Sequence, residues 1–419
     1  MKINLISFSD KRGGAGIAAN NQYRLVSKFH SVKYIVAEKK SHDLGTLGPG
    51  KFSYGIHFVL RVVSLCLSKL QRSRNHVKHS LNVFGSMHVC NSIDHDADII
   101  HLHWFNNETL SLRQLEDLLR KYRGRVVITL HDEWFFCGSE HHSLESMRYI
   151  DGYLSSNKNV EGLDIDKWVF NRKLGLKSDL RNKNVIFTAP SMWLVNKARS
   201  SMLLMGLSVK YVPNFIDVDI FVPKPLEQSR SSLLVPEDKM VICFGALGGT
   251  LNYLKGYDLL AEALKRLKVL KPDLNVHLLI FGGEKKLEKR FLEFDVTYTG
   301  HVSDPNQLAR VYSASDVVIV PSRVESFGQV AAESLACETP VICFDNSAVA
   351  EIVDDQLSGF IAKAFSTDDL ASKIDKILTI PSEQRRSLGK YGRNKILKNY
   401  SSEVVVPILN DIYQTNTID

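Results

Sequence analysis

The segment 316-DVVIVPSRVESFGQVAAESLACETPVICF-344 contains the pattern from which the fold is predicted. Two apolar runs rich in β-branched residues, at 316–320 and 340–344, flank an Ala-rich stretch with helical character. Uninterrupted apolar runs of this length are typical of strands that are buried on both faces of a parallel sheet. A strand, a helix and a second strand in this order predict one parallel β-α-β unit.

The same alternation occurs twice along the chain, which predicts two doubly wound α/β domains facing a cleft. The division falls near 213–238, where prolines and serines interrupt the periodicity. We therefore expect an N-terminal domain at 1–213, a C-terminal domain at 214–400, and a helix at 401–419 that could pack back on the N-terminal domain. The predicted strands are Lys2–Phe8, Lys33–Ala37, Asp98–His103, Arg125–His131, Asn184–Ala189, Val209–Val212, Met240–Phe244, Asn275–Phe281, Val296–Thr299, Asp316–Val320 and Pro340–Phe344.

The composition of the 419 residues, 44% hydrophobic and 24% charged, is that of a soluble globular protein with more than one domain. Six scattered cysteines without a C-x-x-C pair indicate buried thiols in a reducing compartment. The segment MKINLISFSDKRGG lacks the layout of a signal peptide, and no run of about 18 uncharged apolar residues predicts a spanning helix. We expect a cytoplasmic protein whose net charge of +7 allows an anionic ligand or surface, and we expect no nucleic-acid partner.

Two glutamates follow the predicted strand at 316–320, in the region where open α/β sheets bind ligands. Glu325 lies in a loop with Ser326–Gly328, whose backbone N–H groups can bind phosphate, and Gly328 has no Cβ to block close approach. Glu333 lies in the second turn of the predicted helix, where its carboxylate can accept hydrogen bonds from a ribose diol. For an isolated pair, one capping and one surface glutamate would be the plainer interpretation.

This region also resembles a known family. The stretch 296–353, with VTYTGHVSDPNQLARVYSASDVVIVPS, ESFGQVAAE, TPVICFD and AVAEIV, resembles the C-terminal domain of the retaining glycosyltransferases of family 4, which have the two-domain GT-B fold. SFSDKRGGAGIAANNQYRLV, DIIHLHW and VVITLHDEWFFCG are similar to the family's N-terminal glycine loop and strands. APSMWLVNKA, VPNFID and LKGYDLLAEAL are similar to its middle part. The resemblance covers most of the chain and is weakest at 40–95 and 140–180.

The resemblance implies a hexosyltransferase-like enzyme that takes its sugar from a nucleoside-diphosphate sugar, retains the anomeric configuration, and uses no metal or other cofactor. Glu325 would orient the donor sugar. Lys255, in LKGYDLL, matches the family's lysine for the donor diphosphate, where it would act as a point charge. The family carries an arginine near this lysine, and GALGGTLNYLKG contains none. The residues of the C-terminal domain that would bind the donor are Ser326, Phe327, Gly328 and, at the ribose, Glu333.

The resemblance also assigns roles in the N-terminal domain, which would bind the acceptor. Gly14 and Gly16, in the glycine loop, would approach the donor by backbone contact, and His131, at the end of a strand, would contact the donor sugar. A structural, hydrogen-bonded histidine is the alternative for His131. In relatives that build bacterial surface polysaccharides such as O-antigen, the acceptor is a lipid-linked oligosaccharide at the inner membrane. We therefore expect a sugar or a lipid-linked oligosaccharide as acceptor.

Other functions stay open from the residues alone. Gly14-Ala-Gly16-Ile-Ala-Ala19 fits the dinucleotide fingerprint, with Glu38 as a ribose ligand, although Ser9–Arg12 separates its glycines from the strand. That pattern would indicate a nicotinamide-dependent oxidoreductase. An epimerase or phosphorylase of the same fold would act without an acceptor alcohol. A non-catalytic sugar-binding module would be expected to lack Glu325 or Lys255.

A zinc site is the functional alternative for one group of residues. Cys137, His141 and His142 lie close to His131 in the sequence. Their spacing lacks a second convincing pair of ligands, so we expect no metal site.

The stretch between Asp43 and Asp94 contains no acidic residue and six lysines and arginines. Within it, Ile56–Leu70 is apolar nearly all round, with a narrow polar stripe at helical spacing, and it is too short to span a bilayer. Two interpretations are open: 51–80 lies on an anionic membrane surface, which would make the protein peripheral on the inner membrane, or the helix is buried in the N-terminal domain. The stripe comprises His57, Arg61, Ser64 and Ser68, and the cations whose replacement by Gln would remove most membrane binding are Arg72, Arg74 and Lys78.

Overall fold

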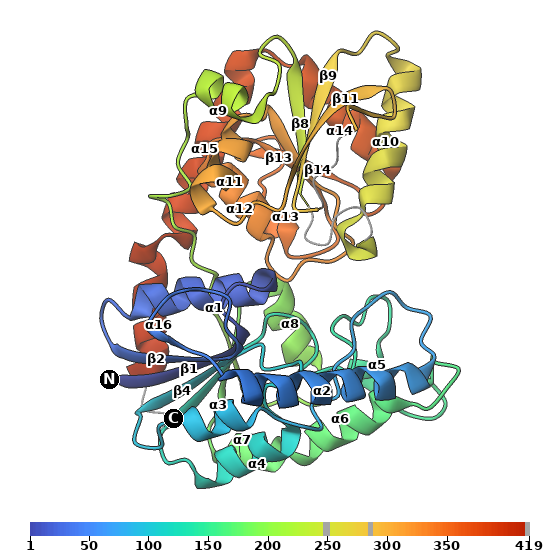
Figure 1. Cartoon of the computed structure of the whole chain (residues 1–419). Coiled ribbons are helices and arrows are strands. Elements are labelled where there is room, and N and C mark those ends of the chain that lie inside the picture. Colours follow the sequence, from blue (N-terminus) through green and yellow to red (C-terminus); the bar gives the residue numbers. More distant parts are fainter. Residues whose placement is uncertain (246–251, 284–287, 415–419) are drawn as a thin grey trace. The chain divides into compact units, whose positions relative to one another are not determined.

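The computed structural model describes residues 1–245, 252–283 and 288–414, and the chain divides into two compact units. The N-terminal unit comprises Met1–Phe215 and Val405–Asp419, and the C-terminal unit comprises Ile216–Val404 (Figure 1). Each unit has its own sheet, and nearly all strand pairs in both sheets are parallel. The predicted class of parallel-sheet α/β domains is therefore confirmed.

The sheet of the N-terminal unit has the strand order β3-β2-β1-β4-β5-β6-β7 and is parallel throughout. β1 lies inside the sheet between β2 and β4, and its Ile3 is aligned with Val32 on one side and with Ile99 on the other. All strands except the two-residue β3 were predicted. The strands are β1 (Lys2–Ser9), β2 (Ser31–Glu38), β3 (Thr46–Leu47), β4 (Ile99–His103), β5 (Arg125–Thr129), β6 (Ile186–Ala189) and β7 (Ser208–Tyr211).

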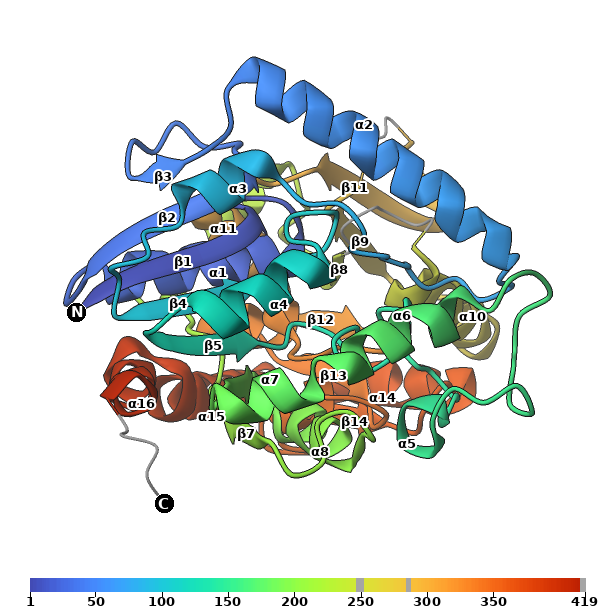
Figure 2. The same cartoon turned by 90° about the horizontal axis from the view of Figure 1, so that it is seen from below.

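Helices cover both faces of this sheet (Figure 2). On one face, Leu25 of α1 and Leu409 of α16 share a core with Ile99. On the other face, α4, α6, α7 and α8 pack on residues such as Ile128 and Phe187. The helices are α1 (Gly13–Val26), α2 (Lys51–Ser68), the 3-10 helix η1 (Lys69–Gln71), α3 (Met87–Ser92), α4 (Leu112–Lys121), α5 (Arg148–Asp151), α6 (Ile165–Gly175), α7 (Lys177–Asn182), α8 (Met192–Ser200) and α16 (Ser402–Gln414).

The sheet of the C-terminal unit has the order β10-β11-β9-β8-β12-β13-β14, and only the β10–β11 pair is antiparallel. β10 and β14 were not predicted, because one has two residues and the other begins with a glycine. The strands are β8 (Met240–Gly245), β9 (Val276–Phe281), β10 (Arg290–Phe291), β11 (Phe294–Gly300), β12 (Val317–Val320), β13 (Val341–Phe344) and β14 (Gly359–Ala362).

Both faces of this second sheet are buried, which explains its uninterrupted apolar runs. Successive residues of a strand point to opposite faces, so Val318 packs with α12 while Ile319 packs with α10 and α14. The helical elements of the unit are α9 (Leu226–Leu233), the 3-10 helix η3 (Tyr253–Lys255), α10 (Tyr257–Leu270), α11 (Pro305–Ser313), α12 (Gln329–Ala336), α13 (Val349–Ile352), α14 (Thr367–Thr379) and α15 (Ser382–Tyr400).

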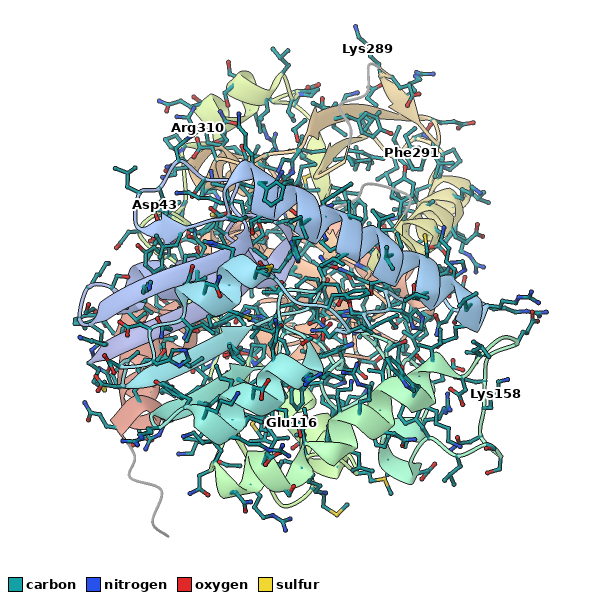
Figure 3. The ribbon with its side chains drawn as sticks, turned by 60° about the horizontal axis from the view of Figure 1, so that its bottom comes forward. Asp43, Glu116, Lys158, Lys289, Phe291 and Arg310 are labelled. Atoms are coloured by element: carbon teal, nitrogen blue, oxygen red, sulfur yellow. The ribbon has the colours of Figure 1, made fainter. Side chains whose placement is uncertain are left out.

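Helix α2 differs from one expectation and from one of the two interpretations that the sequence left open. Together with η1 it runs over 21 residues, Lys51–Gln71. Among the described residues, this is the one helix whose length and composition would allow it to cross a membrane. It is also not a buried core helix, because only His57 and Ser64 of α2 are buried. Figure 2 shows it as the outermost element on its side of the unit, and Figure 3 labels Asp43, which precedes it in the chain.

Candidate functional site

An ion pair joins two elements at the carboxyl edge of the second sheet. Lys255 ends η3, and Glu325 lies in the loop between β12 and α12. Nζ of Lys255 lies 2.6 Å from Oε1 of Glu325, and Oγ of Ser322 donates to the same oxygen at 2.8 Å. The two side chains are 26% and 17% exposed, so a ligand can reach both. A cation and a carboxylate held in this way can bind the phosphate and hydroxyl groups of one ligand.

Gly256 makes this pair possible. Its φ is +65°, and a Cβ at this position would lie 1.9 Å from the carbonyl oxygen of Pro321, which directly follows β12. The absent side chain lets the start of α10 contact the end of β12. Because Lys255 directly precedes Gly256, this close approach places the Lys255 ammonium beside the β12–α12 loop.

The β12–α12 loop is fixed by hydrogen bonds to the segment after β13. The backbone N–H of Glu325 donates to Oγ of Ser347 at 3.2 Å, and its carbonyl accepts from the N–H of Ala348 at 3.2 Å. Gly328 caps α12 with a φ of +105°. Phe327 is buried in the core of the unit, whereas Ser326 is half-buried. The ring of Phe327 therefore belongs to the core and is not available to a ligand at this edge.

An arginine does lie near Lys255, although it comes from another part of the sequence. Nη1 of Arg323 donates to the carbonyl oxygen of Tyr253 at 2.8 Å. The guanidinium of Arg323 lies 3.9 Å from the centre of the Tyr253 ring. It also forms two hydrogen bonds to Asp258, at 2.8 and 2.6 Å. These bonds hold η3 against the β12–α12 loop, so Arg323 is a positioning residue for Lys255 rather than an additional free cation.

Glu333 is the second predicted carboxylate, and its side chain is already hydrogen-bonded. Tyr312 Oη donates to Oε2 at 2.8 Å, and Gln329 Nε2 donates to Oε1 at 2.8 Å. The residue is 5% exposed. Burial raises its pKa to about 7, although the bonds from Gln329 and Tyr312 act in the opposite direction. Glu333 therefore titrates near neutral pH, and each of its oxygens keeps capacity for a further hydrogen bond.

The predicted glycine loop of the N-terminal unit is the first turn of α1 rather than a loop. Helix α1 begins at Gly13, directly after a short turn at the end of β1. A Cβ at Gly16 would lie 2.7 Å from the carbonyl oxygen of Ser9, whereas no atom lies within 4 Å of a Cβ built at Gly14. Gly16 is therefore explained by packing of α1 on β1, whereas Gly14, like Gly13, has the open surroundings that close approach of a ligand requires.

His131 lies two residues beyond β5 and is half-buried. Its Nε2 lies 2.9 Å from Nδ1 of His103, whose ring is 4.2 Å from that of His101. Burial lowers the pKa of His131 to about 4 and that of His101 to about 3. Burial also lowers the pKa of His103 well below its ordinary value, so all three rings favour the neutral form at pH 7. The bond between His103 and His131 was not predicted, because the sequence pattern gives no distance between side chains on adjacent strands.

Three cations surround Glu38, the residue that the nicotinamide alternative needs as a ribose ligand. Arg12, Lys40 and Arg61 place nitrogens 3.3, 3.2 and 3.0 Å from its carboxylate. Burial alone would raise the pKa of Glu38, but the bond from Lys40 and the charges of Arg12 and Arg61 hold it below its usual value. These contacts occupy the carboxylate oxygens that a ribose diol would use.

The residues considered for zinc have separate partners. Cys137 is fully buried, and burial raises the pKa of its thiol. Nδ1 of His141 lies 2.6 Å from Oδ2 of Asp132, and Nδ1 of His142 lies 3.6 Å from Oε1 of Glu133. Within residues 1–245, 252–283 and 288–414, no group of three or more His, Cys, Asp or Glu side chains is arranged to hold a metal ion.

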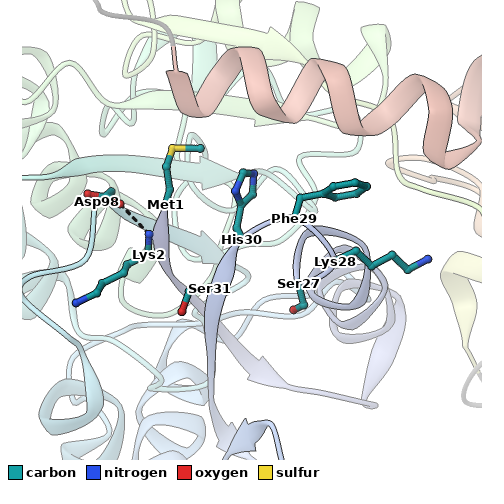
Figure 4. A pocket seen from close by; sticks show the side chains of 8 residues that line it. All are labelled: Met1, Lys2, Ser27, Lys28, Phe29, His30, Ser31 and Asp98. Atoms are coloured by element: carbon teal, nitrogen blue, oxygen red, sulfur yellow. Dashed lines mark hydrogen bonds between the residues drawn. The ribbon is translucent and has the colours of Figure 1, made fainter.

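A separate pocket lies at the amino edge of the first sheet (Figure 4). Met1, Lys2 and Ser31 line it at the starts of β1 and β2, and the backbone N–H of Lys2 donates to Oδ2 of Asp98 at 2.7 Å. Ligands of open α/β sheets bind at the opposite, carboxyl edge. The candidate site is therefore not in this pocket.

The C-terminal unit contains a segment of a known family. Residues 227–395 match the family described as Glycosyl transferases group 1. Over 194 residues the chain is 31% identical to the D-inositol 3-phosphate glycosyltransferase of Segniliparus rotundus, a match that covers 44% of this chain and 42% of that protein. Over 255 residues it is 28% identical to the lipopolysaccharide 1,2-N-acetylglucosaminetransferase of Salmonella typhimurium, covering 57% of this chain and 64% of that protein. The chain thus spans about half the length of these relatives.

Solved structures share the fold over nearly the whole chain. Sucrose-phosphate synthase from Thermosynechococcus elongatus has a TM-score of 0.66 at 19% identity, covering 99% of this chain and 98% of that one. Anabaena HepE in complex with UDP and glucose has a TM-score of 0.63 at 15% identity, covering 99% and 100%. At these identities the likeness shows the fold, which is that of two Rossmann-like domains as in the GT-B glycosyltransferases. The predicted fold class is confirmed.

Proposed function

We propose that the protein is a glycosyltransferase that moves a sugar from a nucleoside-diphosphate sugar to an acceptor hydroxyl. The observation that carries this proposal is the ion pair of Lys255 and Glu325, held at a sheet edge within the segment 227–395 that matches Glycosyl transferases group 1. Anabaena HepE, which shares the fold, is in complex with UDP and glucose, and this supports a nucleotide-sugar donor.

The reaction breaks the bond between the anomeric carbon and the diphosphate oxygen, so negative charge develops on the leaving group. We assign the stabilisation of that charge to the ammonium of Lys255 and to the backbone N–H groups of Ser326–Gly328, at the start of α12. Glu325 would accept hydrogen bonds from the hydroxyls of the donor sugar, and Glu333 from the ribose. The chemistry assigned to these residues needs no metal or other cofactor.

We further assign retention of configuration, as in family 4. Among the described residues, the carboxylate that pairs with Lys255 is Glu325, which also accepts a hydrogen bond from Ser322. We therefore propose that the acceptor hydroxyl approaches the sugar on the face from which the diphosphate leaves. A phosphate oxygen of the leaving group then accepts the proton of that hydroxyl. In the N-terminal unit, Gly14 and the neutral His131 are proposed to contact the donor, His131 as a hydrogen-bonding group without charge.

The proposed acceptor is a lipid-linked oligosaccharide in bacterial surface polysaccharide synthesis, of which O-antigen is one example. The support is the match to the Salmonella typhimurium lipopolysaccharide 1,2-N-acetylglucosaminetransferase. The D-inositol 3-phosphate glycosyltransferase of Segniliparus rotundus makes a phosphorylated cyclitol the competing acceptor. The nicotinamide alternative has no support from the relatives described above. An epimerase or phosphorylase would not lengthen an acceptor alcohol by a sugar taken from a nucleotide sugar.

Donor binding is expected to strengthen about tenfold between pH 6 and pH 8 because of Glu333. The pKa of Glu333 in the folded protein is about 7, above the ordinary value of a glutamate, so its ionisation destabilises the folded state. The free energy of unfolding therefore falls as the pH rises from the ordinary glutamate pKa to about 7. A ribose diol donates to the ionised carboxylate, which favours binding above that pKa. The measurement is calorimetric titration of the full chain with UDP-, GDP-, ADP- and dTDP-sugars, with NAD for comparison.

Glu333→Gln should weaken donor binding about 10-fold or more at pH 8 and should remove its pH dependence. Glu262→Gln is the matched control, because Glu262 lies on the solvent side of α10 in the same unit. An unchanged pH profile in Glu333→Gln would contradict the ribose assignment, and preferential binding of NAD would contradict the proposed function.

A further inference from the structure

Helix α2 packs on the N-terminal unit through its polar stripe and leaves its apolar side exposed. Of its residues only His57 and Ser64 are buried, and both are polar. Most amphipathic helices of globular proteins have the reverse arrangement. The exposed apolar residues of α2 and η1 are Phe52, Ile56, Phe58, Val59, Val62, Val63, Leu65, Leu67 and Leu70, and Phe52, Val59 and Leu65 are 83%, 59% and 57% exposed.

Specific bonds fix this inverted orientation. Nε2 of His57 donates toward the carbonyl oxygens of Asn107 and Glu108, at 3.1 and 2.9 Å. Oγ of Ser64 donates to Oε1 of Glu108 at 2.6 Å. Arg61 reaches Oε2 of Glu38 at 3.0 Å and places its guanidinium 4.6 Å from the centre of the Phe8 ring. The stripe that contains Arg61 therefore faces the protein.

The far end of the helix is fixed as well. Nε2 of Gln71 donates to Oδ2 of Asp166 at 2.8 Å, and the N–H of Asp166 donates to Oε1 of Gln71 at 3.0 Å. The N–H of Gly162 donates to the carbonyl of Gln71 at 2.9 Å. Crossing a bilayer would break these bonds and those of His57 and Ser64. A position along the membrane surface keeps them all.

We propose that the exposed face of α2 docks on an anionic lipid bilayer, with the helix parallel to the surface and its apolar side in the interface. A helix of 18 residues is about 27 Å long, and contiguous exposed apolar surfaces that are rimmed by polar residues mark protein or membrane interaction sites. A groove of about 340 Å³ between α2 and α3, lined by Phe52, Ile56, Leu60 and Met87, extends the apolar surface. The inference goes beyond sugar transfer and does not depend on it.

Charge selects an anionic lipid surface as the partner. No acidic residue lies between Asp43 and Asp94, and the exposed cations Lys51, Lys69 and Arg72 lie at the two ends of the apolar face. Such cations bind anionic headgroups while the face between them enters the acyl boundary. Two cations expected from the sequence to serve this purpose have other partners: Arg74 pairs with Glu161, and Nζ of Lys78 lies 4.2 Å from the centre of the Trp104 ring.

A second copy of the chain is the competing occupant. In an antiparallel, two-fold pairing of α2 helices, Lys51 of one copy would face Lys69 and Arg72 of the other. Like charges at both ends, without an acidic residue in the helix to compensate, oppose that pairing. Anionic lipid headgroups can instead pair with these same cations.

The test is flotation of the full-length protein with vesicles of phosphatidylcholine alone or with one-third phosphatidylglycerol. Wild-type protein should float with the anionic vesicles at low salt and bind the neutral ones at least about threefold less. The triple variant Phe52→Ser, Val59→Ser, Leu65→Ser should lose about tenfold or more in binding to anionic vesicles. Lys69→Gln with Arg72→Gln should lose less and should reduce the dependence on salt.

The matched control is Val269→Ser with Leu270→Ser, because both residues are highly exposed apolar residues at the end of α10 in the other unit. This control should bind vesicles as the wild type does. Absence of wild-type binding to anionic vesicles, or full binding by the triple variant, would overturn the proposal. A dimer in light scattering that the triple variant abolishes would assign the face to a second copy. Because the triple variant should keep donor binding, failure here is separable from failure of the proposed function.

Discussion

Glu325→Ala and Lys255→Ala are each expected to lower kcat by about 100- to 1,000-fold while the fold stays intact. Lys255 supplies the charge that stabilises the leaving diphosphate, and Glu325 orients both the donor sugar and, through the 2.6 Å contact, the ammonium of Lys255. Neither side chain is in a core, and a partly exposed ion pair contributes at most about 1 kcal/mol to stability.

The measurement is initial-rate kinetics at saturating donor, with thermal unfolding of each purified variant. Lys271→Ala is the matched control, since Lys271 also pairs with a carboxylate, Asp375, in the same unit but away from the β12–α12 loop. It should keep near wild-type kcat. If either site variant also keeps near wild-type kcat, the assignment of Lys255 and Glu325 is wrong. If a variant unfolds at a much lower temperature, its lower kcat reflects damage to the fold and not the loss of a site residue.

Gly256→Ala is expected to lower the free energy of unfolding by about 2–5 kcal/mol, the second large effect. The methyl group would lie 1.9 Å from the carbonyl oxygen of Pro321 at a backbone φ of +65°. Relief requires that α10 withdraw from the end of β12, which also moves Lys255 away from Glu325. Activity should therefore fall together with stability.

Gly175→Ala is the comparison for that experiment. A Cβ at Gly175, at the end of α6, has no atom within 4 Å, and alanine favours a helix by about 0.5–1 kcal/mol over glycine. Urea unfolding of both variants gives the difference directly. A Gly256→Ala variant as stable as the wild type would show that the approach of α10 to β12 is not required.

The fold was predictable because its strands carry a strong local signal. Val318 and Ile319 are adjacent and both fully buried on opposite faces, so the sequence of β12 is apolar without interruption. β14 carries no such signal: it begins at Gly359, which is needed because a Cβ there would lie 1.9 Å from the carbonyl oxygen of Val341. That requirement comes from the neighbouring strand and not from the local sequence.

The site was predictable in part, for a related reason. Strand ends indicated that Glu325 lies where ligands bind. The resemblance assigned both Glu325 and Lys255 to the donor, but the contact between them joins residues 70 positions apart and was not predicted. The pairing of Arg323 with Asp258 was missed, because an arginine after a strand gives no indication of its partner. Gly16 was assigned to ligand approach, whereas the structure assigns it to packing against Ser9.

Helix α2 shows where periodicity misleads. The pattern correctly identified a narrow stripe of polar residues, and the usual rule places such a stripe toward solvent or headgroups. In the structure the stripe faces inward because Glu108, a buried carboxylate, accepts hydrogen bonds from Ser64 and from the backbone N–H groups of Asn82 and Phe84. A sequence does not show which side of a helix meets a buried acceptor.

The central claim is sugar transfer, and mass spectrometry of products tests it most directly. The full chain is incubated with a panel of nucleotide sugars and lipid-linked oligosaccharides in the presence of EDTA. The account predicts an acceptor heavier by one sugar residue, matched by release of the nucleoside diphosphate, in wild-type protein and not in Glu325→Ala. An unchanged acceptor with every donor, or transfer that EDTA abolishes and a divalent cation restores, would contradict it.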